Sequence, residues 1–258
     1  MSDFQNTSQN RTDGLEDYRK ALPFVLPLFV HLLLATFLTP DVAGSFEGNG
    51  FENSIRPEMT AEAWTYIGLL ATQVVAAIFL VVIFREPIFK SFPLRLSWWS
   101  VLIGTVGFFV WIGICYPQLE GRVLTLLGFD FTRPAFNPFD ITDPAIRTLF
   151  LAVRFSVLCL VVPVIEELLV RGWLIRWIES PDWETVSLKE LSWRALIAAS
   201  IYGVVAHPME AIAAFVWFGL VTWMMNRNGN FWDCVVAHGV TNLILGLYVV
   251  NMGQWHLW

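Results

Sequence analysis

Long apolar segments recur along the whole chain, and they limit its fold more than any other feature. A membrane-spanning helix needs about 20 mainly apolar residues, within a range of about 17–25. Seven segments of this kind are present, some of them short, at residues 22–38, 64–84, 98–116, 146–165, 192–207, 209–225 and 234–250. Lipid offers the backbone no hydrogen-bond partners, so such segments form helices. The sequence therefore predicts an all-α polytopic membrane protein with about seven transmembrane helices, within a range of about six to eight.

The composition agrees with this prediction and argues against nucleic acid as a partner. Of 258 residues, 56% are hydrophobic and 15% are charged, whereas a soluble domain has about 25% charged residues. The net charge of −6 gives no basic surface, so we expect membrane lipid and no nucleic acid as a partner. The three cysteines lie in apolar runs and have neither the spacing of a metal site nor that of a disulfide framework.

The chain divides into a polar tail and one membrane domain. Residues 1–20 are polar and predict a disordered cytoplasmic tail. Residues 21–258 predict a single transmembrane domain, in which 22–38 is a retained first helix and not a cleaved signal peptide. Polar residues at 39–63 and 117–145 predict loops, the second with a short interfacial helix.

The distribution of Lys and Arg predicts the orientation in the membrane. With the N-terminus in the cytoplasm, eleven of the 16 Lys and Arg residues fall in inside segments and four fall outside. Cytoplasmic loops are enriched in Lys and Arg. We therefore expect an integral membrane protein with a cytoplasmic N-terminus and an external C-terminus.

Three charged residues stand at the end of one apolar run, in the stretch VVPVIEELLVRGW at residues 161–173. Charges at bilayer depth usually face a protein interior or a wet cavity. Residues four apart on a helix share a face, and adjacent residues do not. Glu167 and Arg171 are therefore expected to pair, which leaves Glu166 to face a cavity as a general base. The alternative is an ordinary ion pair at a helix end, with Glu166 in water.

Two further apolar segments carry polar side chains. His207 ends one run, and His238 and Asn242 share one helix face in the last run because they are four apart. The alternative for each is hydrogen bonding between helices. Arg154 lies within the fourth span and is expected either to balance a glutamate or to lie near a loop. His31 has no polar companion at helical spacing and receives no role.

Together these side chains predict hydrolytic chemistry. A glutamate and a histidine can deprotonate a water molecule, and a second histidine and an amide can stabilise an oxyanion by hydrogen bonds. No serine or cysteine is clearly paired with a base, so a covalent intermediate is not expected. This chemistry needs no cofactor and no metal. The expected catalytic residues are Glu166, His207, His238 and Asn242, with Glu167 and Arg171 as structural support.

The same residues resemble the motifs of the CAAX-protease and bacteriocin-processing family of intramembrane proteases, also called the Abi family. The family pattern Glu-Glu-x-x-x-Arg is matched in full at residues 166–171, and His-x-x-x-Asn is matched in full at residues 238–242. The pattern Phe-x-x-x-His keeps His207 but has Gly203 where phenylalanine is expected, with Tyr202 one place earlier. The resemblance covers roughly residues 146–250, which we take as the protease-like core.

The resemblance implies an all-α membrane fold around a conical, water-filled polar cavity. It implies that Glu166 activates water with the aid of His207, that His238 and Asn242 form the oxyanion hole, and that Glu167 and Arg171 support the site. The expected function is an endopeptidase that cleaves near the C-terminus of a membrane-associated peptide or lipidated protein. The chain also looks like the bacterial CAAX prenyl protease-related branch, which implies a place in a bacterial inner membrane and association with an exosortase sorting or processing system.

Two other functions are left open by the sequence. One is a zinc metallopeptidase with Glu and two His as ligands, although the His-Glu-x-x-His spacing is missing. The other is a non-catalytic membrane scaffold or immunity-type protein that keeps the same fold, to which the Gly203 departure points.

Overall fold

A computed structural model describes residues 2–38, 58–117, 119–126, 128 and 137–257. All regular secondary structure in these residues is helical, and six helices are long and apolar enough to cross a membrane. One further apolar helix, α10, is shorter. The prediction of an all-α polytopic membrane protein with about seven helices is confirmed.

The helices of the bundle overlap the predicted spans, but the first helix begins well before its span and the fourth ends well after its span. They are α1 (Ser2–Leu38), α3 (Glu58–Ile83), α5 (Trp98–Cys115), a long composite helix (Pro144–Glu179), α10 (Trp193–Ala206), α11 (Ala211–Asn228) and α12 (Phe231–Met252). The other elements are short, namely α4 (Arg85–Ser91), α6 (Leu119–Leu126), η1 (Pro138–Asp140), η4 (Trp183–Thr185), η5 (Pro208–Glu210) and, after the last helix, η6 (Trp255–Leu257). Helix α6 lies in the loop that was predicted to hold a short helix, whereas residues 39–57 of the other loop fall outside the described residues.

Two π-helical segments interrupt the composite helix. It consists of α7 (Pro144–Ser156), η2 (Val157–Val161), α8 (Val162–Glu167), η3 (Leu168–Leu174) and α9 (Ile175–Glu179). Pro163 lies near the end of η2 and has no N–H to continue an α-helical hydrogen-bond pattern. The predicted fourth span ended at residue 165, but the helix continues to Glu179, so the charged motif lies inside it.

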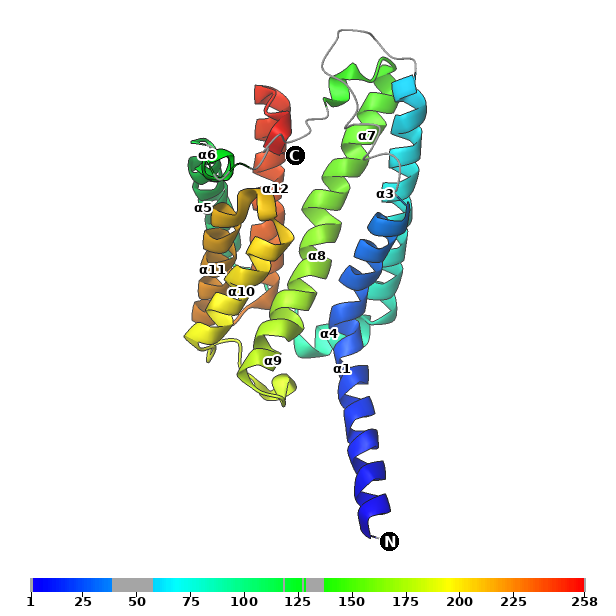
Figure 1. The fold of residues 1–258 in the computed structure, drawn as a ribbon, viewed down its shortest axis with the longest axis vertical. Coiled ribbons are helices and arrows are strands. Elements are labelled where there is room, and N and C mark those ends of the chain that lie inside the picture. Colours follow the sequence, from blue (N-terminus) through cyan, green and yellow to red (C-terminus); the bar gives the residue numbers. More distant parts are fainter. Residues whose placement is uncertain (1, 39–57, 118, 127, 129–136, 258) are drawn as a thin grey trace.

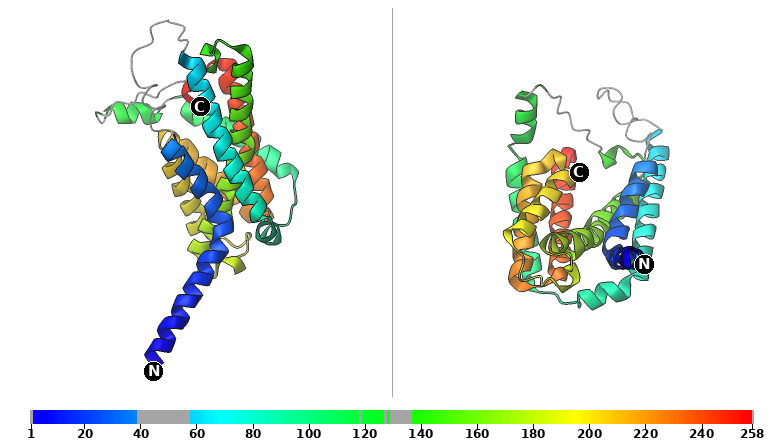
Figure 2. Two further views of the ribbon diagram at one scale, coloured as in Figure 1. Left: turned by 90° about the vertical axis from the view of Figure 1, so that its right-hand side faces the viewer. Right: turned by 60° about the horizontal axis from the view of Figure 1, so that its bottom comes forward.

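The composite helix divides the bundle into two parts. Helices α1 and α3 lie on one side of it, and α5, α10, α11 and α12 lie on the other (Figures 1 and 2). The larger core forms between the four helices of the second part and includes Trp217, Phe218 and Ala237. A smaller core joins α1 to the composite helix through Leu28 and Ile165. The composite helix is therefore packed on both faces.

Small residues let α12 approach its neighbours closely. A Cβ atom at Gly104 of α5 would lie 2.6 Å from the carbonyl oxygen of Ala237, and one at Gly239 would lie 2.6 Å from that of Cys159. Small residues at helix interfaces are typical of membrane proteins, because packing drives helix association in lipid. Helix α12 is thus held against both α5 and the composite helix.

The N-terminal segment differs from its prediction. Residues 2–20 were expected to be a disordered tail, but they form the first part of α1 and extend beyond the rest of the bundle (Figure 2, left). No proline interrupts this segment, and a helix that already exists is extended more easily than a new one is begun. The two ends of the chain lie at opposite ends of the bundle (Figure 1). Which end faces the cytoplasm stays a prediction.

Candidate active site

Helix α8 places both glutamates of the charged motif in the interior of the protein. Glu166 is 5% exposed and Glu167 is 0% exposed. The short α-helical turn that holds them lies between η2 and η3, and π-helical segments are frequent at functional sites. The two carboxylates point to different partners, as adjacent positions on a helix require.

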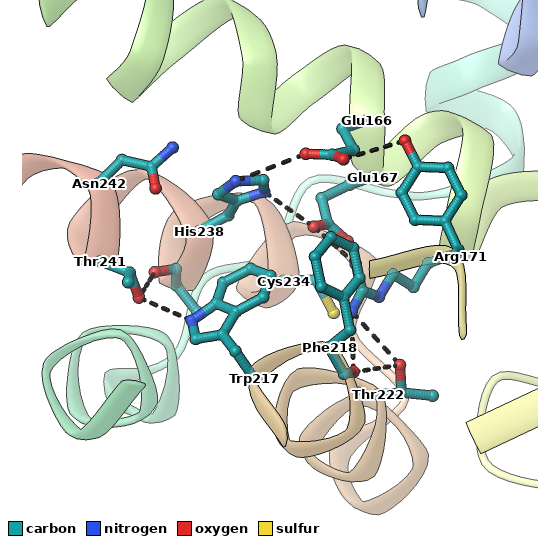
Figure 3. Close-up of polar contacts among 12 residues, drawn as sticks. Glu166, Glu167, Arg171, Trp217, Phe218, Thr222, Cys234, His238, Thr241 and Asn242 are labelled. Carbon is teal, nitrogen blue, oxygen red and sulfur yellow. Dashed lines mark hydrogen bonds and ion pairs between the residues drawn. The ribbon is translucent and has the colours of Figure 1, made fainter. Parts of the chain in front are cut away.

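Glu167 forms a fully buried ion pair with Arg171. Nη1 of Arg171 donates to Oε1 of Glu167 at 2.8 Å and to Oε2 at 2.7 Å. Nη2 of Arg171 donates to the carbonyl oxygen of Phe218 at 3.0 Å and to Oγ1 of Thr222 at 3.4 Å. The guanidinium also lies 4.9 Å from the centre of the Phe218 ring. The pair predicted from the four-residue spacing is present and is anchored to α11 (Figure 3).

His238 of α12 lies between the two carboxylates. Its Nδ1 is 3.0 Å from Oε1 of Glu167, and its Nε2 is 3.6 Å from Oε2 of Glu166. An ionised carboxylate only accepts hydrogen bonds, so Nδ1 carries the hydrogen of the contact with Glu167. The Trp217 ring packs edge-on against the imidazole at 4.7 Å between ring centres. Glu167 therefore links Arg171 to His238 and fixes the histidine ring (Figure 3).

Glu166 has a second partner that the sequence analysis did not assign. The hydroxyl group of Tyr202, on α10, donates to Oε1 of Glu166 at 2.9 Å. The sequence analysis noted Tyr202 only because it precedes Gly203, the position at which the chain differs from the family pattern. Tyr202 lies five residues before His207, a spacing that does not share a helix face, so no local pattern of the sequence points to it.

A cavity of about 230 Å³ brings the expected catalytic residues together. Glu166, His207, His238 and Asn242 all line it, although they come from three separate parts of the chain. One water molecule occupies about 30 Å³ in the liquid, so the cavity has room for several waters or for a short part of a substrate. The structure shows that the four residues line one cavity. Their catalytic roles stay predictions.

His207 and Asn242 are each held by neighbouring groups. His207 follows the last residue of α10, directly before Pro208, and its ring lies 5.6 Å from the Trp111 ring and 6.0 Å from the Phe218 ring. The Nδ2 atom of Asn242 donates to the carbonyl oxygen of Leu158 at 2.7 Å. That carbonyl belongs to η2, where the helical hydrogen-bond pattern changes. An amide nitrogen carries two hydrogens, and this bond uses one of them.

Phe218 explains how the chain accommodates Gly203 at the motif position for phenylalanine. A Cβ atom at Gly203 would lie 2.5 Å from Cδ2 of Phe218 and 3.0 Å from the carbonyl oxygen of Ala214. The Phe218 ring also lies 5.5 Å from the Tyr202 ring. An aromatic ring is thus present beside His207, but α11 supplies it instead of α10.

We expect Gly203→Ala to lower the free energy of unfolding by about 1–3 kcal/mol, the usual range for overpacking a tight core. The added methyl group forces the Phe218 ring or α11 to move. Thermal denaturation in detergent measures the change. Gly68→Ala is the matched control, because a Cβ atom there meets nothing within 4 Å. The combination of Gly203→Ala with Phe218→Leu should recover part of the loss, and equal stability of Gly203→Ala and the control would contradict this account.

Arg154, whose role the sequence left open, lies at the same cavity. Its guanidinium donates from Nη1 to the hydroxyl group of Tyr66 on α3 and lies 5.9 Å from the centre of that ring. Arg154 and Glu210 both line the cavity. The cavity wall therefore carries charges of both signs, and Arg154 is well away from the ends of the composite helix.

No group of three His, Cys, Asp or Glu side chains is arranged to hold a metal ion among the residues that the structure describes. Two of the three side chains that would serve as zinc ligands have other partners there. Glu166 contacts Tyr202, and His238 uses Nδ1 for Glu167.

Comparison with known protein families adds an independent finding. Residues 148–244, which are less than half of the chain, match the family model described as Rce1-like, type II CAAX prenyl endopeptidase Rce1-like. The matched region contains all six residues that were predicted for the site. No curated protein and no solved structure shows a significant match.

Proposed function

We propose that this chain is an intramembrane endopeptidase with Glu166 as its general base, because residues 148–244 match the family model described as Rce1-like, type II CAAX prenyl endopeptidase Rce1-like. The family match supports a CAAX-type endopeptidase in general terms, and the six apolar helices support an integral membrane protein. The mechanism and the substrate are our proposal. The observation that carries it is the Glu166 carboxylate on the wall of a cavity shared with His207, His238 and Asn242.

The proposed reaction is direct hydrolysis of a peptide bond. Glu166, aided by His207, removes a proton from a water molecule, and the water oxygen attacks the scissile carbonyl carbon. The resulting oxyanion is stabilised by hydrogen bonds from His238 and Asn242. The C–N bond then breaks, the leaving amine takes the proton from Glu166, and the products are a carboxylic acid and an amine.

The contacts of His238 and Asn242 limit how they act in this reaction. Nδ1 of His238 donates to Glu167, so an oxyanion contact must come from Nε2 with a hydrogen of its own. In that state both ring nitrogens carry hydrogen and the ring is positively charged. Asn242 already donates one hydrogen to Leu158. Its second amide hydrogen is the one for the oxyanion.

The substrate class follows from the surroundings of the cavity. The site lies within helices long enough to cross a membrane, so a substrate must reach it from the bilayer or its surface. We propose a membrane-associated or lipidated peptide, cleaved near its C-terminus, with membrane lipid as the second partner. A bacterial inner membrane with a cytoplasmic N-terminus is part of this proposal, and the association with an exosortase system stays a prediction.

Incubation of the purified protein in detergent with a prenylated CAAX peptide, and with the same peptide without the prenyl group, tests the proposed function. Mass spectrometry identifies the fragments, and cleavage of the prenylated peptide supports the proposal. Metal analysis of the same preparation distinguishes the proposed glutamate peptidase from a zinc metallopeptidase. Near-stoichiometric zinc, together with loss of cleavage on chelation, would favour the metallopeptidase. No cleavage of either peptide would favour the non-catalytic scaffold.

A further inference from the structure

The two oxygens of the Glu166 carboxylate have different surroundings. The hydroxyl group of Tyr202 donates to Oε1 at 2.9 Å, whereas Nε2 of His238 lies 3.6 Å from Oε2 (Figure 3). A hydrogen bond from nitrogen to oxygen is about 2.7–3.2 Å long, so the contact with His238 is longer than a hydrogen bond. Oε1 is therefore occupied by Tyr202, and Oε2 keeps its capacity to accept a hydrogen bond from water.

Tyr202 reaches Glu166 from outside the cavity. Glu166 lines the cavity, but Tyr202 is not among the described residues that line it. A substrate in the cavity therefore meets Glu166 and not Tyr202. Any effect of the Tyr202 hydroxyl group on the reaction must pass through the carboxylate of Glu166.

The carboxylate of a glutamate needs a partner to keep one orientation. The last torsion angle of a glutamate side chain is broad and is not limited to sharp rotamers. Arg171 holds both oxygens of Glu167, and Tyr202 holds one oxygen of Glu166. Because the two oxygens belong to one rigid group, the bond to Oε1 also sets the direction of Oε2. Misplacement of a reacting group by about 1 Å can lower a rate by about 10²-fold.

The packing of α10 fixes the position of the Tyr202 ring. The ring lies 5.5 Å from the Phe218 ring and packs against both the larger and the smaller core. Adjacent residues of a helix point about 100° apart, so Tyr202 is directed to Glu166 while Gly203 faces Phe218. The glycine lets α11 come close to α10, and the tyrosine before it uses this packing to hold its hydroxyl group in place.

We propose that Tyr202 is a positioning residue for the general base and that Oε2 of Glu166 is the oxygen that takes the proton. This role rests on the proposed function and specifies how its base is oriented. One O–H bond of water breaks, the proton goes to Oε2, and the electron pair on the water oxygen forms the bond to the scissile carbonyl carbon. Oε1 accepts the hydrogen bond from Tyr202 before and after this step, because a protonated carboxyl group still has an acceptor oxygen.

Cleavage of the prenylated CAAX peptide by Tyr202→Phe tests this role, with kcat and KM measured separately. Phenylalanine keeps the ring and removes only the hydroxyl group. We expect kcat to fall by about tenfold or more, the size expected for the loss of a hydrogen bond to a charged group. KM should change by less than about twofold, because the hydroxyl group acts on the chemical step and not on binding. Thermal denaturation in detergent sets an assay temperature at which every variant is folded.

Tyr248→Phe provides the matched control. Tyr248 is a partly buried tyrosine of α12, its ring lies 5.8 Å from the Phe108 ring, and it is not among the described residues that line the cavity. The control loses the same hydroxyl group, and both kcat and KM should stay as in the unaltered protein. Tyr202→Leu removes the ring together with the hydroxyl group. Its kcat should fall at least as far as that of Tyr202→Phe.

The outcomes separate this role from the proposed function. An unchanged kcat in Tyr202→Phe overturns the role and leaves the endopeptidase in place, and a loss confined to Tyr202→Leu would assign Tyr202 to packing alone. A higher KM with an unchanged kcat in Tyr202→Phe also overturns the role, because it places the effect in substrate binding. No cleavage by the unaltered protein overturns the proposed function and this role with it.

Discussion

Replacing Glu166 by glutamine should abolish cleavage and leave the fold intact. Glutamine keeps the size of the side chain and an oxygen that accepts the hydrogen bond from Tyr202. It cannot take a proton from water, so the reaction loses its general base. Such a loss typically lowers the rate by about 10²–10⁴-fold. The buried ion pair between Glu167 and Arg171 stays intact in this variant. We therefore expect little change in the melting temperature.

The measurement is kcat/KM for the prenylated peptide, beside thermal denaturation of the same sample in detergent. Glu184→Gln is the control for removal of a carboxylate, because Glu184 forms a half-exposed pair with Lys20 at 3.1 Å and lies outside the cavity. The control should cleave normally. If Glu166→Gln retains full cleavage, another group activates the water. If the chain has a biological function that Glu166→Gln leaves untouched, the non-catalytic scaffold becomes the better account.

The helices of the fold could be predicted because lipid leaves the backbone few choices. Segments of about 20 apolar residues must satisfy their own hydrogen bonds, and residues 64–84 and 98–116 accordingly match α3 and α5 closely. The different partners of Glu166 and Glu167 could be predicted as well. Adjacent positions of a helix point in different directions, and the four-residue spacing brings Arg171 beside Glu167 even though Arg171 lies in the π-helical segment η3.

Other parts of the site depend on contacts between helices, which one sequence does not contain. The donation from Tyr202 to Glu166 joins positions 36 residues apart, and no local pattern marks it. Phe218 fills the space over Gly203 from another helix, so the departure from the motif looked like a loss when only the motif was considered. The contact of His238 with Glu167 also arises from packing of α12 against α8.

The composite helix shows a different limit of sequence reasoning. Its predicted end at residue 165 came from the apolar run, which stops at the two glutamates. The helix continues because the charges are satisfied within the protein, by Arg171 and by groups of α11 and α12. A prediction from hydropathy places the end of a membrane-spanning helix at the first charged residues. When those charges are paired inside the protein, the helix can continue past them.

Replacing Glu167 by glutamine should lower stability much more than Glu166→Gln does. Glu167 and Arg171 are both fully buried and are 2.7 Å apart. Glutamine at position 167 leaves the guanidinium without its counter-charge in a poorly solvated place. Removal of one partner of a buried pair typically costs about 3–5 kcal/mol. Arg171→Ala should have a similar effect, since it leaves the Glu167 carboxylate without its cation.

The double variant Glu167→Gln with Arg171→Met separates the two tasks of Glu167. It contains no orphan charge, so thermal denaturation in detergent should show that part of the lost stability returns. Cleavage should stay low, because Nδ1 of His238 no longer faces a carboxylate, and the partner of one ring nitrogen sets the state of the other. Recovery of cleavage together with stability would mean that Glu167 serves only the ion pair. If Glu166→Gln is the unstable variant and Glu167→Gln is the stable inactive one, the roles of the two glutamates are reversed, because the folded protein then depends on the carboxylate that faces the cavity.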